Sequence, residues 1–249
     1  MLIRAGADVN HLNNDLDSPL TIAAKKGDKT SVELLMANGG IVDHANQDND
    51  SPLTLAAMFG HLDCMQLLVD RGANVNHLNN DNETALILAA SHGYLQCVRL
   101  LINNNAYVDF VDDENETALT YAASFGNGDC VHLLLDANAN VNQRNNKQES
   151  AFIWAASCGL GDCLEKMIEK CDDVNQTNAN GDTALHLAAK FGHLNCIEIL
   201  ILAKVNVQLR NKQNKTALDL ASEFRHMACK TALIQVGVGT SELSEQEQD

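Results

Sequence analysis

The sequence has little positive charge and no long apolar run. Its 17 Lys and Arg residues face 33 Asp and Glu residues, which gives a net charge of -16. Since phosphate binding needs a basic surface, this charge argues against a nucleic-acid partner. No run of about 18 or more apolar residues is present, so no membrane insertion is expected. The absence of a charged-then-apolar leader favours an unexported protein, located in the cytoplasm or the nucleus.

Phosphate-binding and catalytic motifs are also missing. The sequence has no Gly-rich phosphate loop, because Gly126-Asn-Gly128 is explained as a turn between helices. Catalysis by Cys-His or by a carboxylate pair needs one site with special surroundings, whereas these residue types recur here in register. Cys158 lies off that register, and its simplest interpretation is a small neutral residue. We therefore expect no catalytic residues and no cofactor.

Cysteine, by contrast, is plentiful and regularly spaced. Six of the eight cysteines recur every 33 residues, at Cys64, Cys97, Cys130, Cys163, Cys196 and Cys229. A second series with the same spacing consists of the Ser or Thr residues at Ser18, Ser51, Thr84, Thr117, Ser150, Thr183 and Thr216. Both series indicate an internal repeat. Equivalent thiols then lie in separate layers, too far apart for disulfides, and reduced thiols fit a cytosolic or nuclear protein.

Residues 46–78 show what one repeat contains. Ser51 is a typical N-cap and Pro52 suits the first turn of a helix, while Gly60 suits a left-handed position at its end. A second apolar helix is predicted over about 62–69, and Gly72 stops it. Neither helix is long enough to be stable alone. Each must bury its apolar face against the neighbouring copies.

The stretches "SPLTLAAMFGHLDCMQLLVDRGANVN" and "TALHLAAKFGHLNCIEILI" resemble the ankyrin repeat. The resemblance implies an all-α solenoid of stacked antiparallel helix pairs with β-hairpin fingers and a concave binding face. It covers about residues 1–237, with seven repeats that start near residues 13, 46, 79, 112, 145, 178 and 211, after a partial N-terminal copy. Because the first copy is partial, we expect the chain to be an excerpt from a longer one. Residues 238–249 are expected to form a disordered acidic tail.

The sequence departs from the ankyrin pattern in several places. The family's inner-helix His is present only as His186, so the hydrogen bonds that it makes are not expected elsewhere. The fingertip Gly is present only as Gly181, and most other fingers have Asn there, which tolerates positive φ. Leu16 and Gln148 fit this position poorly, so their fingers are expected to deviate.

Three copies contain a His-x-x-Cys motif that suggests zinc binding, at His61/Cys64, His193/Cys196 and His226/Cys229. A structural zinc ion needs four converging ligands, and one repeat offers at most two. Packing residues explain the motif better, since small buried thiols are common in protein cores. We expect no metal site.

Acidic residues line up in two columns of the repeat. The outer column lies nearer the fingertip and the inner column directly precedes each Ser or Thr cap. The outer column contains Asp15, Asp48, Asp81 and Glu114, and the inner column contains Asp17, Asp50, Glu83 and Glu116. The pairing fades from Lys147 onward. Acidic loops often serve only solvation, but stacked like charges repel one another, and a basic ligand would relieve this repulsion.

Aromatic and other large side chains form a second set of candidates, near the end of each first helix. They are Met58, Phe59, His92, Tyr121, Phe125 and Trp154. With the acidic columns they predict a noncatalytic module whose concave groove binds a Lys/Arg-rich protein segment. The alternative is an architectural spacer or tether within a larger multidomain scaffold, channel or effector.

Overall fold

The computed structural model describes residues 6–246, and side-chain environments are described through residue 236. The described residues form short helices that alternate with extended loops. Their bounds are α1 Pro19–Lys26, α2 Lys29–Ala37, α3 Pro52–Met58, α4 Leu62–Asp70, α5 Ala85–Ser91, α6 Leu95–Asn103, α7 Ala118–Ser124, α8 Gly128–Asp136, α9 Ala151–Ser157, α10 Gly161–Ile168, α11 Ala184–Phe191, α12 Leu194–Leu202, α13 Ala217–Glu223 and α14 Met227–Gln246. The all-helical prediction is confirmed. The first five residues of the expected partial N-terminal copy lie outside the described part.

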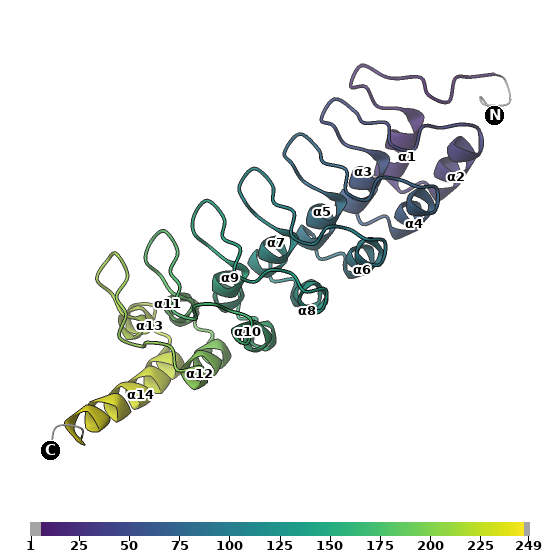
Figure 1. Cartoon of the computed structure of the whole chain (residues 1–249). Helices are drawn as coiled ribbons and strands as arrows, with labels where there is room; N and C mark the ends of the chain where they lie inside the picture. Colours follow the sequence, from purple (N-terminus) through teal and green to yellow (C-terminus); the bar gives the residue numbers. More distant parts are fainter. Residues whose placement is uncertain (1–5, 247–249) are drawn as a thin grey trace. The chain divides into compact units, whose positions relative to one another are not determined.

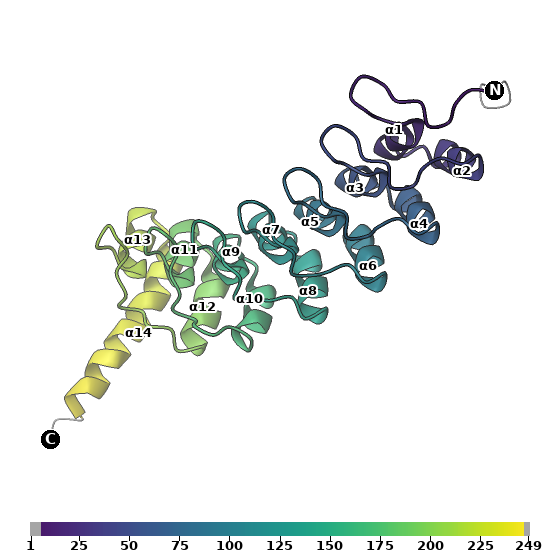
Figure 2. The same cartoon turned by 45° about the horizontal axis from the view of Figure 1, so that its top comes forward.

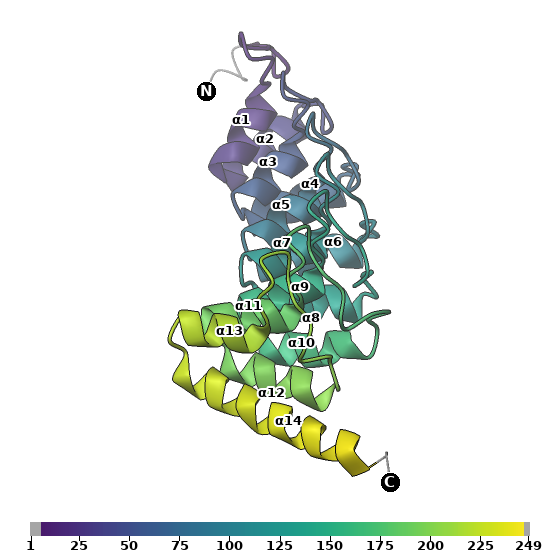
Figure 3. The same ribbon diagram turned by 90° about the vertical axis from the view of Figure 1, so that its left-hand side faces the viewer.

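The chain divides into two compact units. Unit 1 comprises residues 1–121 and 136–139, and unit 2 comprises residues 122–135 and 140–249. In unit 1, the inner helices α1, α3 and α5 pack side by side, and the outer helices α2, α4 and α6 form a second layer (Figure 1). In unit 2, α9, α11 and α13 form the inner layer, with α10, α12 and α14 beside them (Figure 3). The boundary falls within α7 and α8.

Each inner helix begins at a Ser or Thr whose side chain accepts a hydrogen bond from the third helical residue. Ser51, for example, accepts from the backbone N–H of Thr54 at 3.2 Å, and Thr84 accepts from Ile87 at 3.2 Å. Such a cap satisfies one of the backbone donors that a helix leaves unpaired at its start. The caps fix where the finger stops and the helix begins, so they also fix the position of the acidic residue that precedes each cap.

The core consists of aliphatic residues and small residues from both helix layers. The alanine pair of each inner helix from α1 to α11 is buried almost completely, as at Ala56 and Ala57, and allows neighbouring inner helices to approach closely. The six regularly spaced thiols are all buried in the outer helices. Because the helices have only seven to nine residues up to α13, their stability comes from this packing rather than from helix propensity.

The fingers precede the inner helices and lie on one side of them in each unit (Figure 2). All of their tips have a left-handed residue. Leu16 and Gln148 have φ of 60° and 61°, close to the 59° of Asn49, and they make the same turn hydrogen bonds. The expectation that their two fingers deviate is therefore wrong. Hydrogen bonding of the whole finger outweighs the local preference for Gly or Asn.

The last helix, α14, is longer than any other described helix and continues to Gln246. The boundary expected after residue 237 falls inside this helix. Residues 247–249, the end of the expected tail, lie outside the described part. Within residues 6–246, no helix combines the length and the apolar character that a bilayer crossing requires.

Candidate functional site

A buried or half-buried Asn or Asp at the base of most fingers holds the finger in shape. Its side-chain oxygen accepts hydrogen bonds from the backbone N–H groups two and four residues later. In the second finger, Asn46 accepts from Asp48 at 3.0 Å and from Asp50 at 2.9 Å. In the fourth finger, Asp112 accepts from Glu114 and Glu116, both at 2.9 Å. The same position is occupied in the other fingers by Asn13, Asn79, Asn145, Asn178 and Asn211.

Within each unit, backbone hydrogen bonds also join neighbouring fingers. In unit 1, Gln47 donates to the carbonyl of Asp15 at 3.0 Å, and Asn80 donates to the carbonyl of Asp48 at 3.0 Å. In unit 2, Lys212 donates to the carbonyl of Asn180 at 3.0 Å. These bonds hold the side chains of neighbouring fingers in register, so the outer acidic column of unit 1 forms a continuous row.

The outer column is the exposed one. Asp15, Asp48, Asp81 and Glu114 all project into solvent from unit 1. Within the described residues, none of these four carboxylates has a side-chain hydrogen bond or an ion pair. They are therefore available to a ligand, at one carboxylate per finger.

The inner column has a different environment, which the sequence did not predict. Asp17 accepts from the side chain of Asn46 in the next finger at 3.2 Å, and Glu83 accepts from Asn79 at 3.0 Å. Asp50 is only 6% exposed. These carboxylates are partly committed to holding the fingers together, so the two columns are not equivalent binding residues.

Burial raises the pKa of two inner-column carboxylates. Desolvation is the main cause for Asp50, opposed by the Asn79 amide and reinforced by the charge of Asp48. Desolvation is again the main cause for Glu83, with the Asn79 amide opposing it and Asp81 adding repulsion. In addition, Oδ1 of Asp50 is buried without a hydrogen-bond partner in the described residues. An ionised carboxylate in this position opposes folding.

We expect Asp50→Asn to stabilise the protein at pH 7. Because the pKa of Asp50 is raised in the folded state, the parent loses stability as the pH rises from the ordinary value of 3.8 through the folded pKa. The amide has no charge to bury, so its advantage should be full at pH 7 and vanish below pH 3.8. Urea denaturation across this range measures the difference, with the exposed Asp48→Asn as control. A loss of stability at pH 7 would mean that the ionised form is the favoured one.

The large side chains predicted for the site are only partly available in unit 1. Phe59 is 42% exposed and lies 6.2 Å from the ring of His61, and Met58 beside it is half-buried. His92 is exposed and stacks on Tyr94. The hydroxyl of Tyr121 donates to Asp112 at 2.7 Å, so it braces the fourth finger. Of the predicted aromatic side chains of unit 1, Phe59 and His92 are exposed and Tyr121 is half-buried.

Two further candidates belong to unit 2. Phe125 is 64% exposed at the end of α7. Trp154 in α9 is half-buried, and its indole Nε1 is enclosed without a hydrogen-bond partner in the described residues.

The His-x-x-Cys motif joins neighbouring repeats. Nε2 of His61 donates to the carbonyl of Lys25 at 3.1 Å, and Nε2 of His193 donates to that of Ser157 at 2.9 Å. The ring also lies against the turn glycine of the preceding repeat: a Cβ on Gly27 would be 2.5 Å from His61. Where Tyr94 replaces His, it covers Gly60 in the same way. This imidazole is a packing and hydrogen-bonding group.

The thiol of the motif is buried and protonated. Burial raises the pKa of all three motif thiols, Cys64, Cys196 and Cys229, and that of Cys196 reaches about 11. None of the eight cysteines forms a disulfide. Among the described residues, no three His, Cys, Asp or Glu side chains come together as a metal site would require. The packing interpretation of the motif therefore accounts for both of its residues.

His186 makes the finger contact that the resemblance implies. Its Nδ1 bonds to the cap residue Thr183, and its Nε2 donates to the carbonyl of Lys215 in the next finger at 3.0 Å. In the second repeat, the equivalent Thr54 instead donates its hydroxyl to Ser51 of its own repeat at 2.8 Å. The inter-repeat bond made by this side chain is therefore confirmed at His186 and replaced by a local one at Thr54.

Stacked helix pairs joined by tight turns, each preceded by a hydrogen-bonded finger, define a repeat protein. A family model described as ankyrin repeats matches residues 1–79, 71–145 and 152–241. The chain belongs to the ankyrin-repeat family. Proteins of this family are generally protein-protein interaction modules and typically noncatalytic.

The solved structures include a close match in fold. The human ASB11 ankyrin repeat domain aligns with a TM-score of 0.75 and 28% sequence identity, over 88% of this chain and 97% of that one. No curated protein sequence matches the chain. The solenoid fold is thus supported by both the family model and the structural match.

Sequence reasoning overlooked the Asn or Asp at the base of each finger. The signal was present, since this residue recurs every 33 positions in the same register as the cysteines. It resembled ordinary polar loop composition, and only the hydrogen bonds distinguish it from the exposed residues around it.

Proposed function

We propose that the chain is a noncatalytic protein-binding module and that unit 1 binds a Lys/Arg-rich segment along its outer acidic row, Asp15, Asp48, Asp81 and Glu114. The observation that carries this proposal is the set of four exposed carboxylates that have no ion pair with any described residue. The hydrogen-bonded fingers keep these charges together, and their mutual repulsion is only partly screened in physiological salt. A basic ligand relieves that repulsion.

Phe59 adds an apolar anchor to the proposed site. In unit 2, a hollow is lined both by finger residues and by the end of an inner helix, including Lys190 and Phe224. Met58 and Phe59 occupy the equivalent positions in the second repeat. In unit 1, Lys25 is the equivalent of Met58 one repeat earlier, and its charge lowers the pKa of Asp50. This supports an arrangement in which the end of the inner helix faces the finger in unit 1 as well. An aromatic side chain beside carboxylates suits the alkyl stem and charged head of Lys or Arg.

The test is a titration of the protein with a fluorescent eight-residue peptide of alternating Lys and Ser. The variant Asp48→Lys/Asp81→Lys should bind at least about tenfold more weakly, which corresponds to about 1.4 kcal/mol. The parent's affinity should also fall as salt is raised.

The matched control is Glu33→Lys/Asp70→Lys, which makes the same charge change on the exposed surfaces of α2 and α4. Its affinity should stay within about threefold of the parent, since rim charges away from the contact act only at long range. Equal losses of affinity in the two variants would show that only the net charge of the protein matters, and not the acidic row. Absence of peptide binding by the parent would favour the architectural spacer.

We further propose that each of the seven helix pairs in the described part of the chain, with the finger before it, is one repeat. The lack of disulfides among eight cysteines supports a reducing compartment, the cytoplasm or the nucleus. The acidic surface supports a partner other than a nucleic acid.

A further inference from the structure

The fingers of unit 2 present a different surface from those of unit 1. A hollow of about 300 Å³ lies between the last two fingers and the inner helices α11 and α13. Three lysines line it: Lys190 from the end of α11, and Lys212 and Lys215 from the last finger. The outer-column positions that hold carboxylates in unit 1 are occupied here by Asn180 and Gln213. The hollow is therefore polar and basic.

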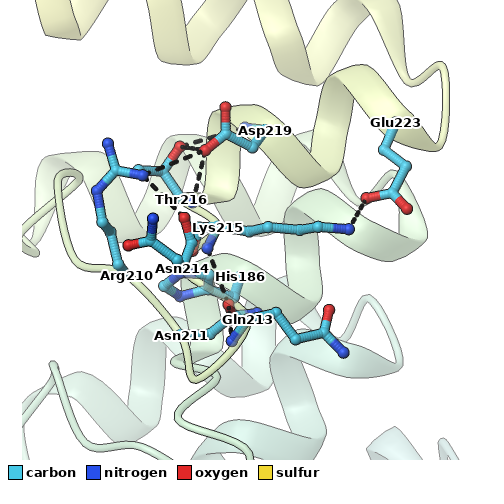
Figure 4. A network of polar contacts seen from close by, with 9 residues as sticks. All are labelled: His186, Arg210, Asn211, Gln213, Asn214, Lys215, Thr216, Asp219 and Glu223. Carbon is cyan, nitrogen blue, oxygen red and sulfur yellow. Dashed lines mark hydrogen bonds and ion pairs between the residues drawn. The ribbon is translucent and has the colours of Figure 1, made fainter.

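The acidic side chains of the hollow are already engaged. Asp182 is 8% exposed and accepts from the side chain of Asn211 at 2.7 Å. Glu223 pairs with Lys215 at 2.5 Å, and Figure 4 shows Lys215 extending from the finger toward it. These contacts neutralise one of the three lysines and leave no carboxylate in the hollow for the other two.

Lys190 and Lys212 are the cations that remain. Within the described residues neither has an ion pair. Nζ of Lys190 lies 5.4 Å from the ring centroid of Phe191 and 5.9 Å from that of Phe224, so the two rings help to hold the ammonium group at the rim of the hollow. Lys212 is exposed on the finger.

The surrounding sequence has the same sign of charge. Residues 183–230 contain seven Lys and Arg residues against three Asp and Glu residues, a net charge of +4 within a chain of net charge -16. A local field of this sign attracts anionic groups and repels the basic ligand proposed for unit 1.

We propose that this hollow binds an acidic segment of a partner protein, with Lys190 and Lys212 as the residues that pair with its carboxylates. The volume matches that of small ligand sites and accommodates one or two acidic side chains. Asn180 and Gln213 are exposed amides beside the lysines and provide donors and acceptors for the backbone of an extended segment. This site is separate from the acidic row, so either proposal can fail without the other.

The test compares two labelled eight-residue peptides, one alternating Glu and Ser and one alternating Gln and Ser, by fluorescence anisotropy. The protein should bind the Glu peptide at least about tenfold more tightly than the Gln peptide. The variant Lys190→Gln/Lys212→Gln should lose about tenfold in affinity for the Glu peptide. Circular dichroism establishes that the variant is folded.

The control variant is Lys204→Gln/Lys230→Gln, which removes the same charge outside the hollow and should bind like the parent. Equal binding of the two peptides, or equal losses in the two variants, would overturn the proposal. Complete competition by millimolar inorganic phosphate would also overturn it, in favour of a small-anion site. Self-association of the protein that these hollow substitutions abolish would overturn it in favour of a second copy of the chain.

Discussion

Replacing Gly60 with alanine is expected to lower the free energy of unfolding by about 3 kcal/mol. Gly60 has a φ of +71°, where a Cβ costs about 1 to 2 kcal/mol. The added Cβ would also be 2.8 Å from the ring of Tyr94 in the next repeat. Relief of that overlap requires the ring or the helix that begins after it to move, which typically costs another 1 to 3 kcal/mol.

Gly72→Ala is the matched control for this prediction. Gly72 has a similar φ of +83°, but nothing lies within 4 Å of the position that its Cβ would take. Urea denaturation should therefore give a loss of only about 1 to 2 kcal/mol for this variant. The double variant Gly60→Ala/Tyr94→Ala should show a favourable coupling between the two sites. Equal losses at Gly60 and Gly72 would show that the ring contact has no energetic weight.

Replacing Asp112 with alanine is expected to cost about 3 kcal/mol, because one buried side chain supports three hydrogen bonds. Asp112 accepts from the N–H groups of Glu114 and Glu116 and from the hydroxyl of Tyr121. Hydrogen bonds to charged groups contribute about 1.5 to 3 kcal/mol each to the free energy of unfolding in favourable cases. The expected loss is smaller than the sum of three such bonds, because Glu114 of this finger is exposed to water.

Asp112→Asn tests the acceptor role directly, since Asn occupies this position in the other six fingers and accepts the same two backbone bonds. This variant should unfold within about 1 kcal/mol of the parent. Denaturation midpoints of the two variants make the comparison. An Asn variant as unstable as the Ala variant would show that the charge of Asp112 matters more than its geometry as an acceptor.

The repeat register and the helix limits could be predicted because they depend on strong local signals. Ser51 and Gly60 bracket α3 as expected, with the helix ending two residues before the glycine. Packing of short helices then follows from their apolar faces. These features need no knowledge of which side chains meet across repeats.

The difference in burial between the outer and inner acidic columns could not be predicted from the repeat register alone. Asp48 and Asp50 are two residues apart and look equivalent in sequence, yet Asp48 is exposed and Asp50 is buried at the finger base. Depth within the finger depends on the cap and on how the next finger covers it, which are tertiary effects. The basic hollow of unit 2 was overlooked for a similar reason, because Lys190 and Lys212 are distant in sequence and meet only in the fold.

Among the described turns that join an inner helix to its outer helix, only the one at Arg225 lacks glycine, and this has a consequence for engineering. Arg225 has a φ of 60° in the slot that Gly192 occupies one repeat earlier, and its side chain is exposed. On Gly192, a Cβ would be 2.5 Å from the His226 ring, whereas Arg225 already has a Cβ there. If a further repeat were grafted after α14, its His or Tyr ring would need to pack against this turn. We therefore expect such a graft to require Arg225→Gly. The residue type at this position therefore decides whether the ring of a following repeat can pack against the turn.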